Sequence, residues 1–148
     1  MRILLDTNVL LRFSHRSDRD YGMIREVVRA LVGRRDRLCF GAQNLVEFWN
    51  VCTRPIEHNG FGLSVSETDE WARMLEAEFR LLPDTERIHA EWRRLVVDHS
   101  VHGVQVYDAR LVAAMLAHGV PQILTLNDRD FKRYTEITAL HPRDVVTA

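Results

Sequence analysis

The fold is decided by the opening stretch of the chain, Met1-Arg2-Ile3-Leu4-Leu5-Asp6-Thr7-Asn8. Its apolar run, residues 3–5, is too short for a helix and is typical of a strand buried on both faces of a sheet. The run ends at Asp6, and Thr7 or Asn8 can cap a helix that begins near Val9. A carboxylate therefore follows a central strand, at the sheet edge where open α/β proteins bind ligands. This stretch alone leaves two roles open for Asp6, binding a divalent cation or only capping the helix.

The composition is that of a globular protein. The chain has 148 residues, of which 46% are hydrophobic and 28% charged, so we expect one domain over residues 1–148 and no membrane span. The net charge of −1 does not indicate a nucleic-acid-binding protein. The basic residues are almost all Arg, which suits phosphate binding but is also produced by a GC-rich genome. We expect no signal peptide, and isolated Cys39 and Cys52 predict reduced core thiols in a cytoplasmic protein.

Strands and helices are predicted to alternate along the chain. Further strands are expected at residues 37–40, 80–82, 120–126 and 136–140, and helices at 9–13, 21–32, 42–53, 66–79, 85–98 and 107–117. Ser66 is a candidate N-cap, and Gly119 a candidate helix end. This alternation predicts an α/β fold with a mostly parallel sheet.

Acidic residues follow two of the apolar strands. Asp6 follows the first strand and Asp128 the strand at residues 120–126, so in a parallel sheet they lie on one edge. Asp108 begins the helix before that later strand, where the helix dipole alone already favours an acid. Carboxylates gathered in one cleft repel unless a cation compensates, and Mg²⁺ or Mn²⁺ held this way supports phosphodiester cleavage. A purely structural role for these acids is left open.

Other catalytic patterns are missing from the sequence. It contains no serine nucleophile elbow, P-loop, dinucleotide-binding glycine motif or His/Cys zinc pattern. Glu47 lies opposite the apolar stripe of its helix, so periodicity alone predicts a surface residue.

Four segments, in order, resemble the motifs of PIN-domain proteins, specifically the VapC-type toxin ribonucleases of bacterial toxin–antitoxin pairs. The segments are residues 3–10, with the first acid Asp6; 43–55, with Glu47; 107–114, with Asp108; and 123–131, the closing motif with Asp128 and Asp130. Each motif alone is weak, but four in this order are specific.

The resemblance implies an α/β/α sandwich that cleaves RNA with Mg²⁺ or Mn²⁺, forms a homodimer and is inhibited by a small antitoxin protein. It implies that Asp6, Glu47 and Asp108 are catalytic metal ligands, together with Asp128 or Asp130. Asn8 and Thr125 resemble the family's polar supporting residues, which orient carboxylates or waters. Ordinary capping and turn chemistry also accounts for both of these residues.

Two other functions are weighed against a nuclease. A phosphatase of the haloacid-dehalogenase kind also begins with strand and Asp, but it needs Asp-x-Asp, and Asn8 stands where the second Asp belongs. A PIN-like domain that binds RNA or protein without cleaving is the main alternative, and the intact set of acids argues against it.

Overall fold

A five-stranded, all-parallel sheet forms the centre of the computed structural model, which describes residues 1–146. The strand order is β3-β2-β1-β4-β5, and the strands are β1 (Arg2–Leu5), β2 (Arg37–Gly41), β3 (Arg80–Leu82), β4 (Gln122–Leu124) and β5 (Thr138–Leu140). The seven helices around it are α1 (Thr7–Ser14), α2 (Tyr21–Gly33), α3 (Ala42–Thr53), α4 (Val65–Glu78), α5 (Glu86–Asp98), α6 (Gln105–His118) and α7 (Pro142–Val146). Two short 3₁₀ helices are η1 (Ile56–His58) and η2 (Asp128–Phe131). The expected α/β/α sandwich is confirmed.

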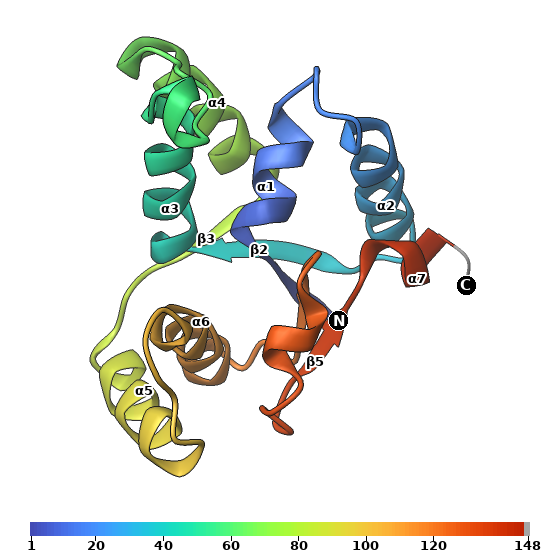
Figure 1. The fold of residues 1–148 in the computed structure, drawn as a ribbon. Helices are drawn as coiled ribbons and strands as arrows, with labels where there is room; N and C mark the ends of the chain where they lie inside the picture. Colours follow the sequence, from blue (N-terminus) through green and yellow to red (C-terminus); the bar gives the residue numbers. More distant parts are fainter. Residues whose placement is uncertain (147–148) are drawn as a thin grey trace.

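The central strand β1 packs against helices on both faces of the sheet (Figure 1). Ile3 and Leu5 join the core formed with α1, α2, α3 and α4, whereas Leu4 joins the core formed with α5 and α6. Alternate side chains of a strand point to opposite faces, so a short uninterrupted apolar run is what a two-sided position requires.

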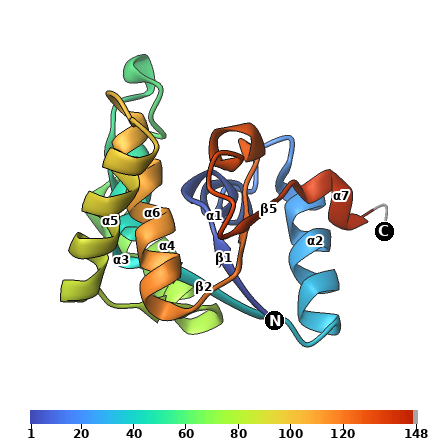
Figure 2. The ribbon, with the colours of Figure 1, turned by 90° about the horizontal axis from the view of Figure 1, so that it is seen from below.

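The two helical layers differ in how they are built. Helix α6 lies beside α5 and buries a wide face rich in small residues, including Ala109, Ala113 and Ala114 (Figure 2). On the other face, α7 packs against α2 near the C-terminal end of the chain. Helix α6 ends at Gly119, whose φ of +66° is the left-handed conformation that glycine adopts most easily.

The structure corrects three local predictions. The N-cap of α4 is Ser64 rather than Ser66, and its hydroxyl accepts from the backbone N–H of Glu67 while Glu67 accepts from the N–H of Ser64. The predicted strand at 120–126 is shorter, since β4 spans only Gln122–Leu124; the backbone N–H of Thr125 still donates to the carbonyl of Leu140 in β5, and its hydroxyl binds Asp6. Helix α1 is capped by Asp6 itself, not by Thr7 or Asn8.

The sequence predicts that both cysteines lie in the core, and the structure places them there. Cys39 and Cys52 are free and buried, and burial raises their pKa to about 11 and about 12. None of the helices within residues 1–146 combines the length and the apolar character needed to cross a membrane.

The capping box of α4 predicts a contrast between two exposed serines. Ser64→Ala removes the acceptor for the Glu67 N–H and should lower the free energy of unfolding by about 1 kcal/mol. Ser66→Ala, in the first turn, should change it by less than about 0.5 kcal/mol. Urea denaturation of both variants measures the difference, and equal losses would contradict the assigned cap.

Candidate active site

The site is built where the sheet changes its direction of winding. The chain runs from β1 outward to β2 and β3 and then returns to place β4 on the other side of β1. In parallel sheets the carboxyl ends of two such strands diverge and leave a crevice between their loops. Leu5 pairs with Leu124 at these ends, and the N–H of Asp6 donates to the carbonyl of Leu124 at 3.0 Å.

Asp6 is held in this crevice by three hydrogen bonds. Its Oδ1 accepts from the backbone N–H of Thr7 at 2.7 Å. Its Oδ2 accepts from the hydroxyl of Thr125 at 2.7 Å and from the amide of Asn8 at 3.3 Å. The side chain is only 7% exposed, and burial raises the pKa of Asp6 despite these donors. The carboxylate is therefore fixed in orientation and poorly solvated.

The two predicted supporting residues also hold the loop that leaves β4. The amide of Asn8 lies 3.4 Å from the Thr125 hydroxyl, and its carbonyl oxygen accepts from the N–H of Leu126 at 3.2 Å. The Thr125 hydroxyl accepts from the N–H of Asn127 at 3.0 Å. The same two side chains thus support Asp6 and hold the turn that follows β4.

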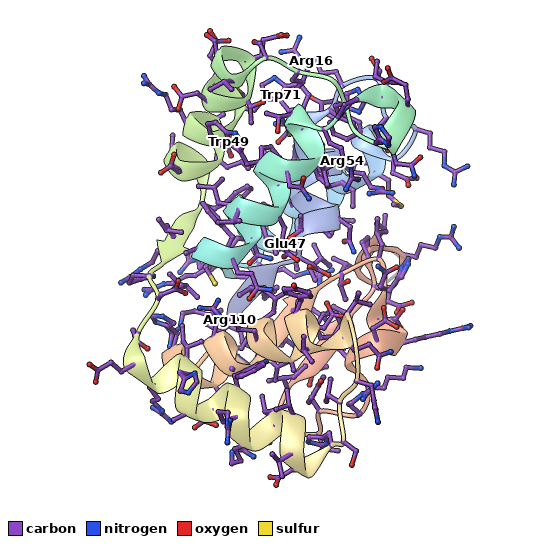
Figure 3. The ribbon with its side chains drawn as sticks, turned by 60° about the vertical axis from the view of Figure 1, so that its left-hand side comes forward. Arg16, Glu47, Trp49, Arg54, Trp71 and Arg110 are labelled. Carbon is purple, nitrogen blue, oxygen red and sulfur yellow. The ribbon has the colours of Figure 1, made fainter. Side chains whose placement is uncertain are left out.

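Glu47 reaches the same crevice from α3. Its Oε1 accepts from the hydroxyl of Thr7 at 3.0 Å, and that hydroxyl accepts from the amide of Asn44 at 3.1 Å. Asn44 is fully buried, and its Oδ1 accepts from the N–H of Gly41 at 2.9 Å, which anchors the start of α3. Glu47 lies between α3 and α6, the helix that carries Arg110 (Figure 3). Glu47 is half-buried rather than exposed as periodicity predicts, because its side chain reaches Thr7 at the start of α1.

Asp108 faces the other acids from the first turn of α6. Burial raises its pKa to about 7, and the negative charges of Asp6, Asp130 and Glu47 add to the shift. The charge of Arg133 opposes it. No hydrogen bond to the Asp108 carboxylate occurs among residues 1–146, so no donor offsets the cost of burying its charge.

The structure separates the two acids of the closing motif. The charge of Asp130 raises the pKa of both Asp6 and Asp108, whereas Asp128 does not act on either. Asp128 lines a neighbouring cleft together with Arg129 and Asp130. The acids that the structure brings within electrostatic reach of one another are therefore Asp6, Glu47, Asp108 and Asp130.

The chemistry of these donors fits a hard divalent cation. All four are carboxylates, the ligands that Mg²⁺ and Mn²⁺ prefer, and they repel one another without a cation to compensate. In the part of the chain that the structure describes, no three His, Cys, Asp or Glu side chains lie close enough to hold a metal as they stand.

Several residues that position the acids were not identified from the sequence. From the sequence, Thr7 is predicted only as a helix cap, and Asn44, Gln43 and Arg133 are not singled out. Gln43 donates to the carbonyl of Tyr107, which ties α3 to α6, and a hydrogen bond from it lowers the pKa of Glu47. One signal was available, because Asn44 precedes Glu47 by three residues and so lies on the same face of the helix.

Comparisons with known proteins place the fold. The family model described as "PIN domain" matches residues 3–137. Curated protein sequences give no match.

Three similar solved structures come from toxin–antitoxin systems. DNA-bound VapBC from Salmonella typhimurium has a TM-score of 0.71 at 16% identity, covering 96% of this chain and 98% of that chain. VapBC2 from Rickettsia felis, bound to a promoter DNA fragment, has a TM-score of 0.68 at 12% identity, covering 95% and 98%. VapC20 from Mycobacterium tuberculosis, described as a toxin that cleaves the sarcin–ricin loop, has a TM-score of 0.59 at 16% identity, covering 82% and 86%. At these identities the likeness is one of fold.

The raised pKa of Asp108 predicts how stability depends on pH in metal-free protein. Protonation of Asp108 stabilises the folded state below pH 4, and this stabilisation is lost as pH rises through about 7. Asp108→Asn removes the loss and should raise the free energy of unfolding at pH 8 by at least about 1 kcal/mol, because one pKa unit corresponds to about 1.4 kcal/mol. Thermal unfolding in EDTA at pH 5 and pH 8 measures it, with exposed Asp98→Asn as the control. No gain at pH 8 would contradict the repulsion.

The buried hydroxyl of Thr125 predicts a loss of stability on an isosteric change. Thr125→Val leaves Oδ2 of Asp6 with Asn8 as its single donor and should cost about 1.5–3 kcal/mol, the range for hydrogen bonds to charged groups. Thr138→Val, at an exposed position of β5, is the matched control. Chemical denaturation at pH 7 compares the two, and equal stability would count against this network.

Proposed function

Because the chain belongs to the PIN-domain family, we propose that it is a metal-dependent endoribonuclease and the toxin of a toxin–antitoxin pair. The observation that carries the proposal is the convergence of Asp6, Glu47, Asp108 and Asp130 at the carboxyl edge of the sheet, where the charges of the other three all raise the pKa of Asp108. Folding tolerates such a cluster at a cost in stability, and a cation with a phosphate ligand offsets that cost.

The same four acids are the proposed metal ligands. A bound Mg²⁺ or Mn²⁺ would neutralise charge on the scissile phosphate and lower the pKa of a water molecule for attack. Asp6, fixed by its three donors, provides a ligand whose orientation needs no rearrangement. Thr7 orients Glu47 through a hydrogen bond. Asp108, whose pKa is raised, would release its proton when the divalent cation binds.

RNA is the proposed substrate. A polyanion approaching four carboxylates needs basic groups near them, and Arg133 and Arg110 are two such groups. Arg133 lies near Asp108, where its side chain donates to Oε1 of Gln105 at 2.6 Å. Arg110 donates to Oε1 of Gln43 at 3.1 Å and pairs with Asp84 at 3.4 Å. The choice of RNA is further supported by the RNA-cleaving description of the M. tuberculosis structure.

Protein partners are proposed from the structural neighbours. Several of these are solved as toxin–antitoxin complexes, including one from Klebsiella pneumoniae. We propose that this chain likewise binds a small antitoxin, which covers the acidic site, and that it forms a homodimer.

Cleavage of a panel of single-stranded and structured RNAs tests the proposed activity. Wild-type protein should cut with Mg²⁺ or Mn²⁺ and not with EDTA. Asp108→Asn should lower cleavage by at least about a hundredfold, the upper end of the loss when even a group supporting a ligand is removed. Asp98→Asn, the same charge change on an exposed ion pair, should retain full activity.

Two further measurements sharpen this test. Asp130→Asn should lose far more activity than Asp128→Asn, because only Asp130 acts on the other acids. Independently of activity, Mg²⁺ should raise the Tm of the wild type at pH 8 and leave that of Asp108→Asn nearly unchanged. Full cleavage by Asp108→Asn would contradict the proposed acid site. No cleavage by folded wild-type protein with either metal would contradict the nuclease and favour a non-catalytic binding domain.

A further inference from the structure

A polar cleft begins at the proposed active site and extends away from it. It has a volume of about 380 Å³ and is lined by Leu126, Asn127, Asp128, Arg129, Asp130 and His141. That volume lies within the range of about 300–1,000 Å³ typical of small-molecule sites. Asp130 is shared between the cleft and the acid cluster, so a group bound in the cleft adjoins the catalytic carboxylates.

The polar side chains of this cleft are available for a ligand. Among residues 1–146, the side chains of Asp128 and Arg129 take part in no hydrogen bond or ion pair. A carboxylate and a guanidinium thus stand next to each other without being paired. His141 is fixed by the backbone N–H of Arg143, which donates to its Nδ1 at 3.1 Å, so the neutral ring carries its proton on Nε2.

The cleft is held rigidly relative to the active site. Its first two lining residues, Leu126 and Asn127, donate their backbone N–H groups to Asn8 and Thr125. The same two side chains donate to Oδ2 of Asp6. One hydrogen-bond network therefore sets the position of the cleft and that of the Asp6 carboxylate together, as a subsite next to the acids requires.

We propose that this cleft binds a guanine base of single-stranded RNA next to the scissile phosphate, and that Asp128 and Arg129 select it. The proposal rests on the ribonuclease function proposed above. It gives Asp128 the role of a specificity residue in place of the metal ligand considered from the sequence.

Guanine is the base whose edges match this pair of side chains. An ionised carboxylate only accepts hydrogen bonds, and guanine presents two neighbouring donors, N1–H and N2–H, on its Watson–Crick edge. A guanidinium only donates, and guanine presents the acceptors O6 and N7, the commonest partners of Arg on bases. Adenine, cytosine and uracil each lack the pair of adjacent donors. Base pairing would hide this edge, so the substrate must be single-stranded at this position.

Binding of modified RNAs tests the subsite without any cleavage. Short fluorescent oligouridylates carry one central guanine, inosine, 7-deazaguanine or adenine, and their affinities are measured by anisotropy in EDTA. Inosine lacks the N2 amino group and 7-deazaguanine lacks the N7 acceptor. Wild-type protein should bind the guanine oligonucleotide about tenfold more tightly than either analogue or adenine.

Two variants assign the contacts. Asp128→Asn should abolish the discrimination between guanine and inosine, and Arg129→Gln that between guanine and 7-deazaguanine. Exposed Asp98→Asn and Arg87→Gln carry the same charge changes elsewhere and should keep both discriminations. Equal wild-type affinity for guanine and inosine, or discrimination that survives in Asp128→Asn, would overturn the proposal.

Cleavage of a random-sequence RNA pool with Mg²⁺ separates this proposal from the nuclease itself. Guanine enriched at one position beside the cut, and lost in Asp128→Asn, supports the subsite. Metal-dependent cutting without any guanine preference would overturn the subsite and leave the nuclease standing. Guanine-selective binding by a protein that does not cut would support the subsite and count against the nuclease.

Discussion

The burial of a charged carboxylate at the end of the central strand is the constraint on which the rest of the site depends. Asp6 can be removed from water only because donors arrive from two directions, from α1 through Thr7 and Asn8 and from β4 through Thr125. These donors require β1 and β4 to be neighbours in register and α1 to begin directly after the strand. Burying Asp6 therefore requires the β1–α1 junction, the pairing of β1 with β4 and the donor side chains all at once.

The acid cluster works against the stability that the two cores supply. Burial and repulsion raise the pKa of Asp6, Glu47 and Asp108 together, so the folded state pays an electrostatic cost near neutral pH that the unfolded chain does not. Neighbouring residues are arranged to limit that cost without cancelling it. Only Arg133 lowers the pKa of Asp108, and no cation of the chain pairs with it among residues 1–146. The negative charge of the acids is therefore left for a bound ligand to compensate.

Sequence reasoning reached the parts of this structure that depend on local patterns. The apolar run before Asp6 predicted the central strand, and small residues after Asp108 predicted the buried helix α6. The position of Glu47 could not be predicted from periodicity, because α3 packs against α1, a helix distant in sequence, and the sequence of α3 does not show this contact. Asp128 and Asp130 could not be separated, because both follow the same strand and only the path of η2 turns one toward the acids. Ser64 was missed because Ser66 offered an equally plausible cap.

The hydrogen bond from Thr125 to Asp6 joins residues 119 positions apart. A contact of this span forms only after the intervening chain has been made and folded, since its loop-closure entropy must first be offset by the packing between. A ribosome elongating this chain therefore carries an unfinished site until β4 has emerged, well after β1, β2 and β3. Fragments that end before β4 lack the second wall of the crevice, so neither premature termination nor proteolysis ahead of β4 releases a working site.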